Sequence, residues 1–322
     1  MKKIQNSESL LQNIRSDVVE NVCEKRTFSA RLAGEKGPMV VLLHGFPDTW
    51  QTFNHQIPFL VQQGYRVLVP VMPGYEQGSA DPEGRYYPTD LVRWLISWLD
   101  HMGEEKVHLV GHDWGAVTAW MAAVMAPERF HSLTAIAIPS LHHMARAIAR
   151  HPTQLLKSWY IGFFQLPGIP ERALDLGHGW LIRRLWRNWS PGWEAPSLHL
   201  QEVCDQLLQP EVKAAALAYY RCLFRVWTGE HRNGRRWLMH PVSLPTLMIS
   251  GHKDGCMDTR LFDEALVDAD FPAGVELYRL MGAGHFCHLE KPDLVNRKIA
   301  RFLVDSERRS AVLAGELDRQ LG

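Results

Sequence analysis

The sequence lacks several features that mark whole classes of proteins. No apolar run approaches the roughly 20 residues that a membrane-spanning helix needs. Two lysines stand near the N-terminus, but no apolar stretch follows them, so a secretory signal is not expected. The 35 Lys and Arg residues equal the 35 Asp and Glu residues in number. This balance gives no reason to expect nucleic acid or an anionic membrane as a partner.

Cysteine is also scarce and has no pattern. The thiols are odd in number and lack Cys-x-x-Cys spacing; they are Cys23, Cys204, Cys222, Cys256 and Cys287. Such scattered residues favour reduced thiols in the cytoplasm over a disulfide framework, and they predict no metal site. Nothing in the sequence indicates an oligomeric state, so a homo-oligomer stays open.

Apolar runs alternate with helical periodicity along the first part of the chain. Hydrophobic residues make up 46% of the sequence, which is ample for a sizeable core. Helical segments are expected at residues 90–99 and from 114 to about 125. Strands are expected at residues 27–32, 39–43, 65–71, 107–110 and 133–138. This alternation predicts an α/β fold with a mostly parallel central sheet and helices on both faces.

The alternation of strand and helix patterns stops between residues 141 and 240. This stretch contains no convincing strand, is rich in Trp and Arg, and reads as a series of helices. Strand character returns at residues 244–250 and 275–278, and a helix at 292–304 precedes a charged tail. We therefore expect core segments at 1–140 and 241–322, with a helical lid at 141–240 over the edge of the sheet where ligands bind. The alternative is an independent second domain, but no Gly/Ser linker borders the stretch.

Residues 107–116 carry the most specific motif. An apolar strand runs into Gly111-His112-Asp113-Trp114-Gly115, and a helix rich in Ala and Met follows. In α/β-hydrolases a tight turn of this form holds the nucleophile on a strained strand-to-helix corner. The central residue here is Asp113, where an esterase has serine. A carboxylate suits displacement at a saturated carbon and leaves an alkyl ester on the enzyme; the alternative is that Asp113 only caps the following helix.

Two further residues complete the order nucleophile, acid, histidine. Asp254 lies in the loop after the strand that ends at Ser250, where the orienting acid is expected, and Asp258 is its competitor. His285 follows the last strand pattern in Met-Gly-Ala-Gly-His-Phe and is the predicted base. His112, the residue before the centre of the turn, is expected to point away and to serve packing.

The stretch His-Gly-Phe-Pro at residues 44–47 follows an earlier buried strand. There the backbone N–H of Phe46, together with that of Trp114, can form an oxyanion hole. With an aspartate nucleophile, this hole serves the carbonyl of the enzyme's own ester. The bond before Pro47 is a candidate for the cis isomer.

Together these three motifs resemble those of the epoxide hydrolases of the α/β-hydrolase fold. Haloalkane dehalogenases share the strand-to-helix turn that carries the nucleophile, here called the elbow and formed by residues 111–115. The resemblance extends from about residue 18 to residue 304. It implies that two lid tyrosines donate hydrogen bonds to the epoxide oxygen. Tyr220 matches the second of them. The first is Tyr160 when the sequences are aligned on Trp-Tyr, whereas alignment on Phe-Gln-x-Pro-Gly puts Phe163 at that position.

The resemblance implies hydrolysis of a small apolar epoxide to a vicinal diol, with water as co-substrate and without metal or organic cofactor. The main alternative is a haloalkane dehalogenase with the same covalent mechanism. Trp114 is present for halide binding, but Phe46 stands where a halide-binding Asn is found in that family. A lidded binding protein without turnover is the alternative from a different class. Asp113, Asp254 and His285 all stand in the expected order, which a decayed site need not retain.

Overall fold

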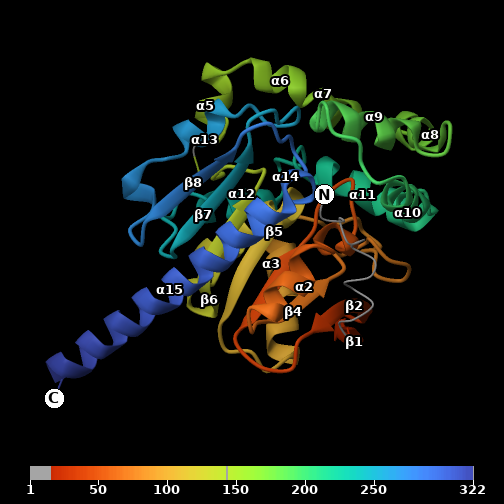
Figure 1. The fold of residues 1–322 in the computed structure, drawn as a ribbon. Helices are drawn as coiled ribbons and strands as arrows, with labels where there is room; N and C mark the ends of the chain where they lie inside the picture. The colour runs from red at the N-terminus through yellow and green to blue at the C-terminus, as the bar shows by residue number, and fades with distance from the viewer. Residues whose placement is uncertain (1–15, 143, 322) are drawn as a thin grey trace, which may run out of the picture.

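The computed structural model describes residues 16–142 and 144–321. Its centre is an 8-stranded sheet with the order β1-β2-β4-β3-β5-β6-β7-β8 (Figure 1). The β1–β2 and β2–β4 pairs are antiparallel, and the remaining pairs are parallel. The strands are β1 (Ser16–Cys23), β2 (Arg26–Ala33), β3 (Met39–Leu43), β4 (Arg66–Pro70), β5 (Val107–His112), β6 (Phe130–Ile136), β7 (Thr246–Gly251) and β8 (Val275–Leu280). The predicted α/β class with a mostly parallel sheet is confirmed.

Helices cover both faces of the sheet and enclose two apolar cores. On one face lie α2 (Gln56–Gln62) and α15 (Pro292–Leu321), and on the other lie α3 (Pro88–His101) and α4 (Trp114–Met125). Successive residues of a strand point to opposite faces. Val40 therefore belongs to the core beneath α2 and α15, while Val41 belongs to the core beneath α3 and α4. Burial on both faces explains why these strands read as continuous apolar runs.

Short elements complete the core. They are the 3-10 helices η1 (Trp50–Phe53), η2 (Pro127–Arg129) and η3 (Asp268–Asp270) and the α-helices α13 (Arg260–Glu264) and α14 (Cys287–Glu290).

Strand β1 was not predicted from the sequence. It is an edge strand, and its Val18 and Val22 side chains are exposed, so no alternation of buried and exposed apolar residues marks it. The turn to β2 consists of Glu24 and Lys25, both with positive φ. Two-residue hairpin turns of this kind favour Asn-Gly or Asp-Gly, and Glu-Lys carries no such signal.

The final helix is longer than predicted. The sequence pattern predicted a helix at residues 292–304 and a charged tail, but α15 continues to Leu321 and runs beyond the sheet (Figure 1). Among the side chains that the structure describes, Leu303 is the last of this helix that belongs to the apolar core. The remainder is rich in Arg, Glu, Ala and Leu, which favour helix without a packing face.

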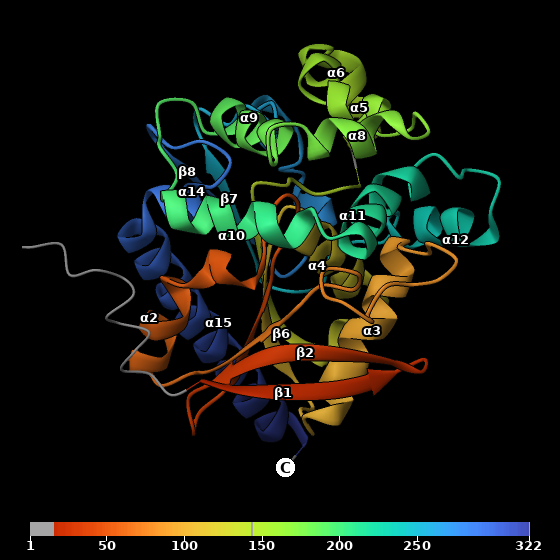
Figure 2. The ribbon, with the colours of Figure 1, turned by 90° about the vertical axis from the view of Figure 1, so that its right-hand side faces the viewer.

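All the helices of residues 141–240, here called the helical insertion, lie in sequence between β6 and β7. They are α5 (Met144–Arg150), α6 (Thr153–Lys157), α7 (Trp159–Phe163), α8 (Ile169–Asp175), α9 (Trp180–Trp189), α10 (Ser197–Leu207), α11 (Pro210–Cys222) and α12 (Gly229–Trp237). Figure 2 shows α8–α11 gathered at the end of the molecule opposite the β1–β2 hairpin. Strands are absent from the described residues of this segment.

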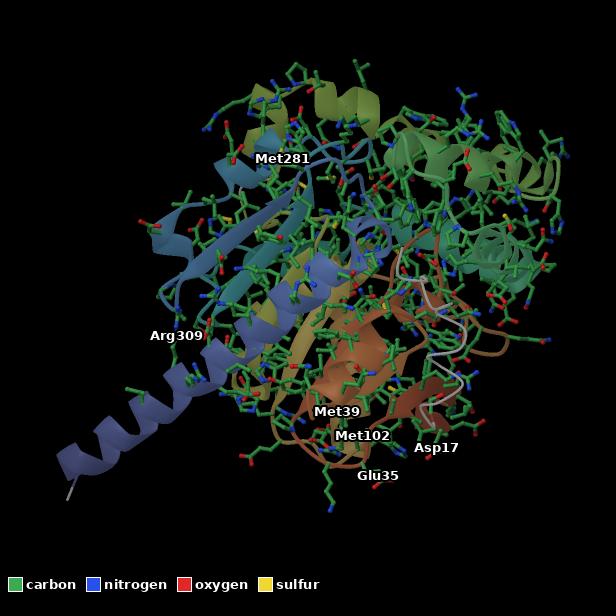
Figure 3. The ribbon with its side chains drawn as sticks, viewed as in Figure 1. Asp17, Glu35, Met39, Met102, Met281 and Arg309 are labelled. Carbon is green, nitrogen blue, oxygen red and sulfur yellow. The ribbon has the colours of Figure 1, made fainter. Side chains whose placement is uncertain are left out.

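The helical insertion lies at the carboxyl ends of the parallel strands. In Figure 3, Met281, which follows β8, lies at the end that carries the insertion, whereas Met39, which begins β3, lies at the opposite end. Hydrogen bonds join the insertion to the loops after two of these strands. The indole of Trp186 donates to the carbonyl of Pro47 after β3, and Lys157 donates to the carbonyl of Asp254 after β7.

Sheet register determines which loops meet there. Leu43, the last residue of β3, pairs with Gly111 of β5, so the loop after β3 adjoins the turn after β5. Gly251 of β7 pairs with Leu280 of β8, so the loops after these two strands are neighbours as well. Four separate segments are thereby brought to one edge of the sheet.

Candidate active site

Asp113 occupies a strained corner between β5 and α4. Its φ of 50° and ψ of −118° lie outside the conformations that non-glycine residues usually adopt. It stands at the N-cap position of α4, but its side chain makes no capping hydrogen bond. The side chain is buried, and its carboxylate faces the loops after β3 and β8. The alternative that Asp113 only caps the helix does not fit this geometry.

Glycines make the corner possible by allowing close approach of backbone. A Cβ at Gly115 would lie 2.0 Å from the carbonyl oxygen of Leu43, and one at Gly111 would lie 2.3 Å from the carbonyl oxygen of Gly115. A Cβ at Gly45 would lie 2.6 Å from Cβ and Oδ1 of Asp113. Any side chain at these three positions would push the elbow out of place.

His285 lies between two carboxylates. Its Nδ1 is 3.1 Å from Oδ2 of Asp254, and its Nε2 is 3.5 Å from Oδ2 of Asp113. The other oxygen of Asp254 accepts hydrogen bonds from the backbone N–H groups of Cys256 and Met257, at 2.7 and 2.8 Å. Asp254 is thus held in a fixed orientation toward the imidazole.

Asp258, the competing acid, faces away from His285. Its carboxylate pairs with Arg260 and accepts a hydrogen bond from Thr153. The Arg260 guanidinium holds the pKa of Asp258 well below its usual range. The structure therefore brings Asp254, and not Asp258, to the histidine.

The charges of the site favour an ionised nucleophile. Burial alone would raise the pKa of Asp113, but contact with His285 and the charge of that residue outweigh burial and hold the pKa below its ordinary value. Burial lowers the pKa of His285, but the charge of Asp254 and the contacts with Asp113 and Asp254 outweigh burial and raise the pKa to about 10. In the free site, one imidazolium thus stands between two carboxylates.

Backbone N–H groups lie beside the nucleophile. The N–H of Phe46 donates to Oδ1 of Asp113 at 2.9 Å, and the Phe46–Pro47 peptide bond is cis, as expected. A Cβ at Gly45 would also lie 2.6 Å from the backbone nitrogen of Trp114, so that nitrogen adjoins the same side of the carboxylate. The two predicted oxyanion donors therefore flank Asp113.

Both predicted tyrosines of the helical insertion lie near enough to Asp113 for its charge to act on their hydroxyls. Tyr160 on α7 and Tyr220 on α11 are buried, and their ring centroids lie 5.6 Å apart. Burial, together with the nearby charge of Asp113, raises the pKa of both hydroxyls well above the ordinary value, so both remain neutral donors. The Tyr220 hydroxyl has no hydrogen-bond acceptor among the described residues. Phe163 is only partly buried and packs against Trp159 and Phe164.

Three residues near the site were not singled out from the sequence. The carbonyl of Trp189, at the end of α9, accepts hydrogen bonds from the N–H groups of Gly255 and His285 at 3.0 and 2.9 Å. The hydroxyl of Ser190 accepts from the N–H of Phe286 at 3.1 Å. The thiol of Cys256 lies 3.4 Å from the Tyr160 hydroxyl. The first two act through the end of a helix that reads as an ordinary amphipathic segment, so no sequence motif marks them.

His112 packs against the loop that carries His285. Its Nε2 contacts the carbonyl of His285 at 3.1 Å, and its ring packs against His288. Burial lowers the pKa of His112 to about 4, so it is neutral and supports the loop that carries His285. This position agrees with the packing role expected from the sequence.

Comparison with known proteins agrees with this fold. Residues 38–292 match the model of the alpha/beta hydrolase fold family. Epoxide hydrolase A of Mycobacterium tuberculosis is 32% identical over 314 residues, covering 86% of this chain and 94% of that protein. Human Epoxide hydrolase 4 is 30% identical over 284 residues, covering 86% of this chain and 75% of that protein. The AB hydrolase superfamily protein YfhM of Bacillus subtilis is 34% identical over 276 residues, covering 84% of this chain and 91% of that protein.

A solved structure has the same architecture. Epoxide Hydrolase A of Mycobacterium thermoresistibile superposes with a TM-score of 0.75 at 26% identity, covering 90% of this chain and 98% of that one. The chain therefore belongs to the α/β-hydrolase fold family and, within it, to the epoxide hydrolases. In the described residues, no helix is long and apolar enough to cross a membrane.

Proposed function

We propose that this protein hydrolyses an epoxide to a vicinal diol through a covalent ester on Asp113. The observation that carries the proposal is the line of contacts from Asp113 to His285 to Asp254, beneath the hydroxyls of Tyr160 and Tyr220. The carboxylate attacks an epoxide carbon, the carbon–oxygen bond of the ring breaks, and a tyrosine donates a proton to the departing oxygen. The product of this step is a hydroxyalkyl ester.

The first step prepares the base for the second. While Asp113 is ionised, its charge helps to keep the proton on His285. Esterification removes this charge, so the pKa of His285 falls, and the proton that the imidazole releases returns through water to the tyrosine that protonated the departing oxygen. His285, still oriented by Asp254, then takes a proton from a water that attacks the ester carbonyl.

The N–H of Phe46 already donates to Oδ1 of Asp113. That oxygen becomes the oxyanion when water attacks, so Phe46, with the N–H of Trp114 beside it, stabilises the tetrahedral intermediate. Collapse of the intermediate releases the diol and restores the carboxylate. In this proposal, side chains and backbone N–H groups of this chain carry out the cycle, and water is the co-substrate.

The helical insertion acts in this proposal as a lid that supplies the proton donors and excludes water. The two tyrosines belong to a cluster of aromatic rings in mutual contact, namely Phe46, Trp114, Tyr160, Phe164, Trp189 and Tyr220. Such a cluster favours a small apolar epoxide. A cytoplasmic location stays a prediction from the unpatterned thiols, all five of which are free.

The test is the intact mass of the His285→Gln variant after incubation with a panel of epoxides and haloalkanes. Without the base, the ester on Asp113 should accumulate. An adduct equal to the full mass of an epoxide supports the proposal and identifies the substrate class. The double variant with Asp113→Asn is the matched control and should carry no adduct.

Other outcomes have distinct meanings. An adduct equal to a haloalkane minus hydrogen halide would identify a dehalogenase, for which the indole of Trp114 beside the nucleophile would bind the halide. A folded variant that forms no adduct with any member of the panel would favour a binding protein without turnover.

A further inference from the structure

Cys256 lies against the proposed nucleophile and base. The thiol is buried, and ligand atoms of Asp113, Cys256 and His285 all lie within 4.8 Å of one another. Each side chain comes from a different loop, after β5, β7 and β8 respectively. We propose that these three residues form an inhibitory site for a divalent zinc ion.

The spacing suits zinc. Its bonds to Cys sulfur are about 2.3 Å, and those to His nitrogen and carboxylate oxygen about 2.0–2.2 Å; in a tetrahedral site the ligand atoms are therefore about 3.3–3.6 Å apart. Nε2 of His285 and Oδ2 of Asp113 are already separated by 3.5 Å. The sulfur of Cys256 lies within 4.8 Å of both atoms, so zinc binding requires a small shift of this short side chain. A sulfur, a nitrogen and an oxygen from protein leave a fourth position for water.

The loop geometry prepares two of these ligands. Nδ1 of His285 is engaged by Asp254, which leaves Nε2 directed toward Asp113, and that buried nitrogen makes no hydrogen bond to a described residue. A carboxylate on the second nitrogen is the usual partner of a metal-binding histidine, because it fixes the orientation of the ring. Cys256 is held by its own N–H, which donates to Asp254.

The charges of the ligands match the charge of the ion. Zinc binds cysteine as thiolate, histidine as neutral imidazole and aspartate as carboxylate. The two anionic ligands offset the two charges of zinc, so the ion and its three ligands together carry no net charge in a buried site, where such charge would be costly.

The thiolate determines which metals bind. Soft sulfur and imidazole ligands favour zinc over magnesium or calcium, which prefer sites made of oxygen alone. Bound zinc occupies both the nucleophile and the base, so its expected effect is reversible inhibition. That consequence rests on the proposed function, whereas the binding itself does not.

Cobalt(II) is a suitable probe, because it takes the place of zinc and absorbs light. We expect the full-length, reduced protein to bind one equivalent and to show a near-ultraviolet thiolate-to-cobalt band. The band should disappear in Cys256→Ser, and zinc affinity, measured by equilibrium dialysis, should fall at least about tenfold, since loss of an outer-shell partner alone costs 10–100-fold. Cys23→Ser, which removes a partly exposed thiol at the end of β1, should retain the band and the affinity.

Absence of the band in folded wild-type protein, or its persistence in Cys256→Ser, would overturn the proposal. If Cys256→Ser does not fold, His285→Gln removes another ligand from a separate loop and should weaken zinc binding to a similar extent; unchanged binding there would contradict the site. Neither readout needs a substrate. A cobalt band without any ester on Asp113 would support the metal site and contradict the proposed hydrolysis. An ester on Asp113 without a cobalt band would support the hydrolysis and contradict the metal site.

Discussion

The sheet core and the helical insertion build their parts of the site by different means. In the core, backbone geometry places the reacting groups: Asp113 stands on a corner that Gly111 and Gly115 make possible, and Asp254 and His285 follow neighbouring strand ends. In the insertion, side-chain packing places them, as with the rings of Tyr160 and Tyr220. Backbone geometry leaves a motif whose physical reason can be read from the residues, whereas the two tyrosines could be found only through the resemblance to a family.

The largest effect that tests this comparison is expected in the core. Asp254→Asn removes the charge that keeps His285 basic and alters the hydrogen bond that orients the ring. Turnover of the epoxide identified by mass trapping should fall about 10³–10⁴-fold, as in other enzymes whose histidine loses its orienting acid. Steady-state kinetics measures this loss, and the ester should accumulate in the variant.

Asp258→Asn is the matched control, since it changes the same atoms in the same loop. Its carboxylate faces Arg260, so turnover should change less than about threefold. Equal losses in the two variants would mean that loop integrity, and not the contact with His285, is being measured.

The sequence was most informative where backbone conformation is demanding. The elbow at Asp113, the cis bond before Pro47 and the helix-only segment between β6 and β7 could all be read from residue types. Strand β1 could not, because exposed edge residues carry no periodic signal. The helical continuation of α15 beyond residue 304 was also missed, since none of its described side chains belongs to the apolar core.

Within the site, the residues that could not be predicted from the sequence are those placed by contacts between distant segments. The carbonyl of Trp189 holds the loops of Asp254 and His285, yet a backbone acceptor has no residue signature. Cys256 is one scattered thiol among five in the sequence and becomes a neighbour of Asp113 only when the loops after β5 and β7 meet. The choice between Tyr160 and Phe163 likewise depended on which face of α7 is buried.

A smaller effect is expected in the helical insertion, because two donors share one task. Tyr220→Phe and Tyr160→Phe should each slow ester formation about 10–100-fold, and the double variant should lose about 10²–10⁴-fold, the range typical of general acid catalysis. Rapid mixing in the His285→Gln background isolates this step, since the ester does not turn over there.

Phe163→Leu serves as the control on the same helix. Its ring packs against Trp159 and Phe164 and carries no donor, so ester formation should stay within about threefold of the unchanged protein. If this variant were as slow as Tyr160→Phe, packing of α7 would matter more than the hydroxyl of Tyr160.

The smallest effect concerns the junction between the two regions. Nε2 of His199 on α10 lies 2.9 Å from Oδ1 of Asp48, a buried residue of the loop after β3. Burial lowers the pKa of His199, but the charge of Asp48 and the hydrogen bond to it raise the pKa by more. The raised pKa means that the pair stabilises the fold fully below the ordinary histidine value of about 6.5 and loses this contribution as pH rises through the raised pKa.

His199→Gln should therefore lower the free energy of unfolding by about 1–2 kcal/mol at pH 6, and by less at pH 9, because a hydrogen bond to a buried charge is lost. Urea titrations at the two pH values measure the difference. His178→Asn is the control: its pair with Asp205 is exposed, Asn tolerates the positive φ at that residue, and the change should stay below about 0.5 kcal/mol. A loss for His199→Gln that did not shrink with rising pH would show that shape at the junction, and not charge, joins the helical insertion to the core.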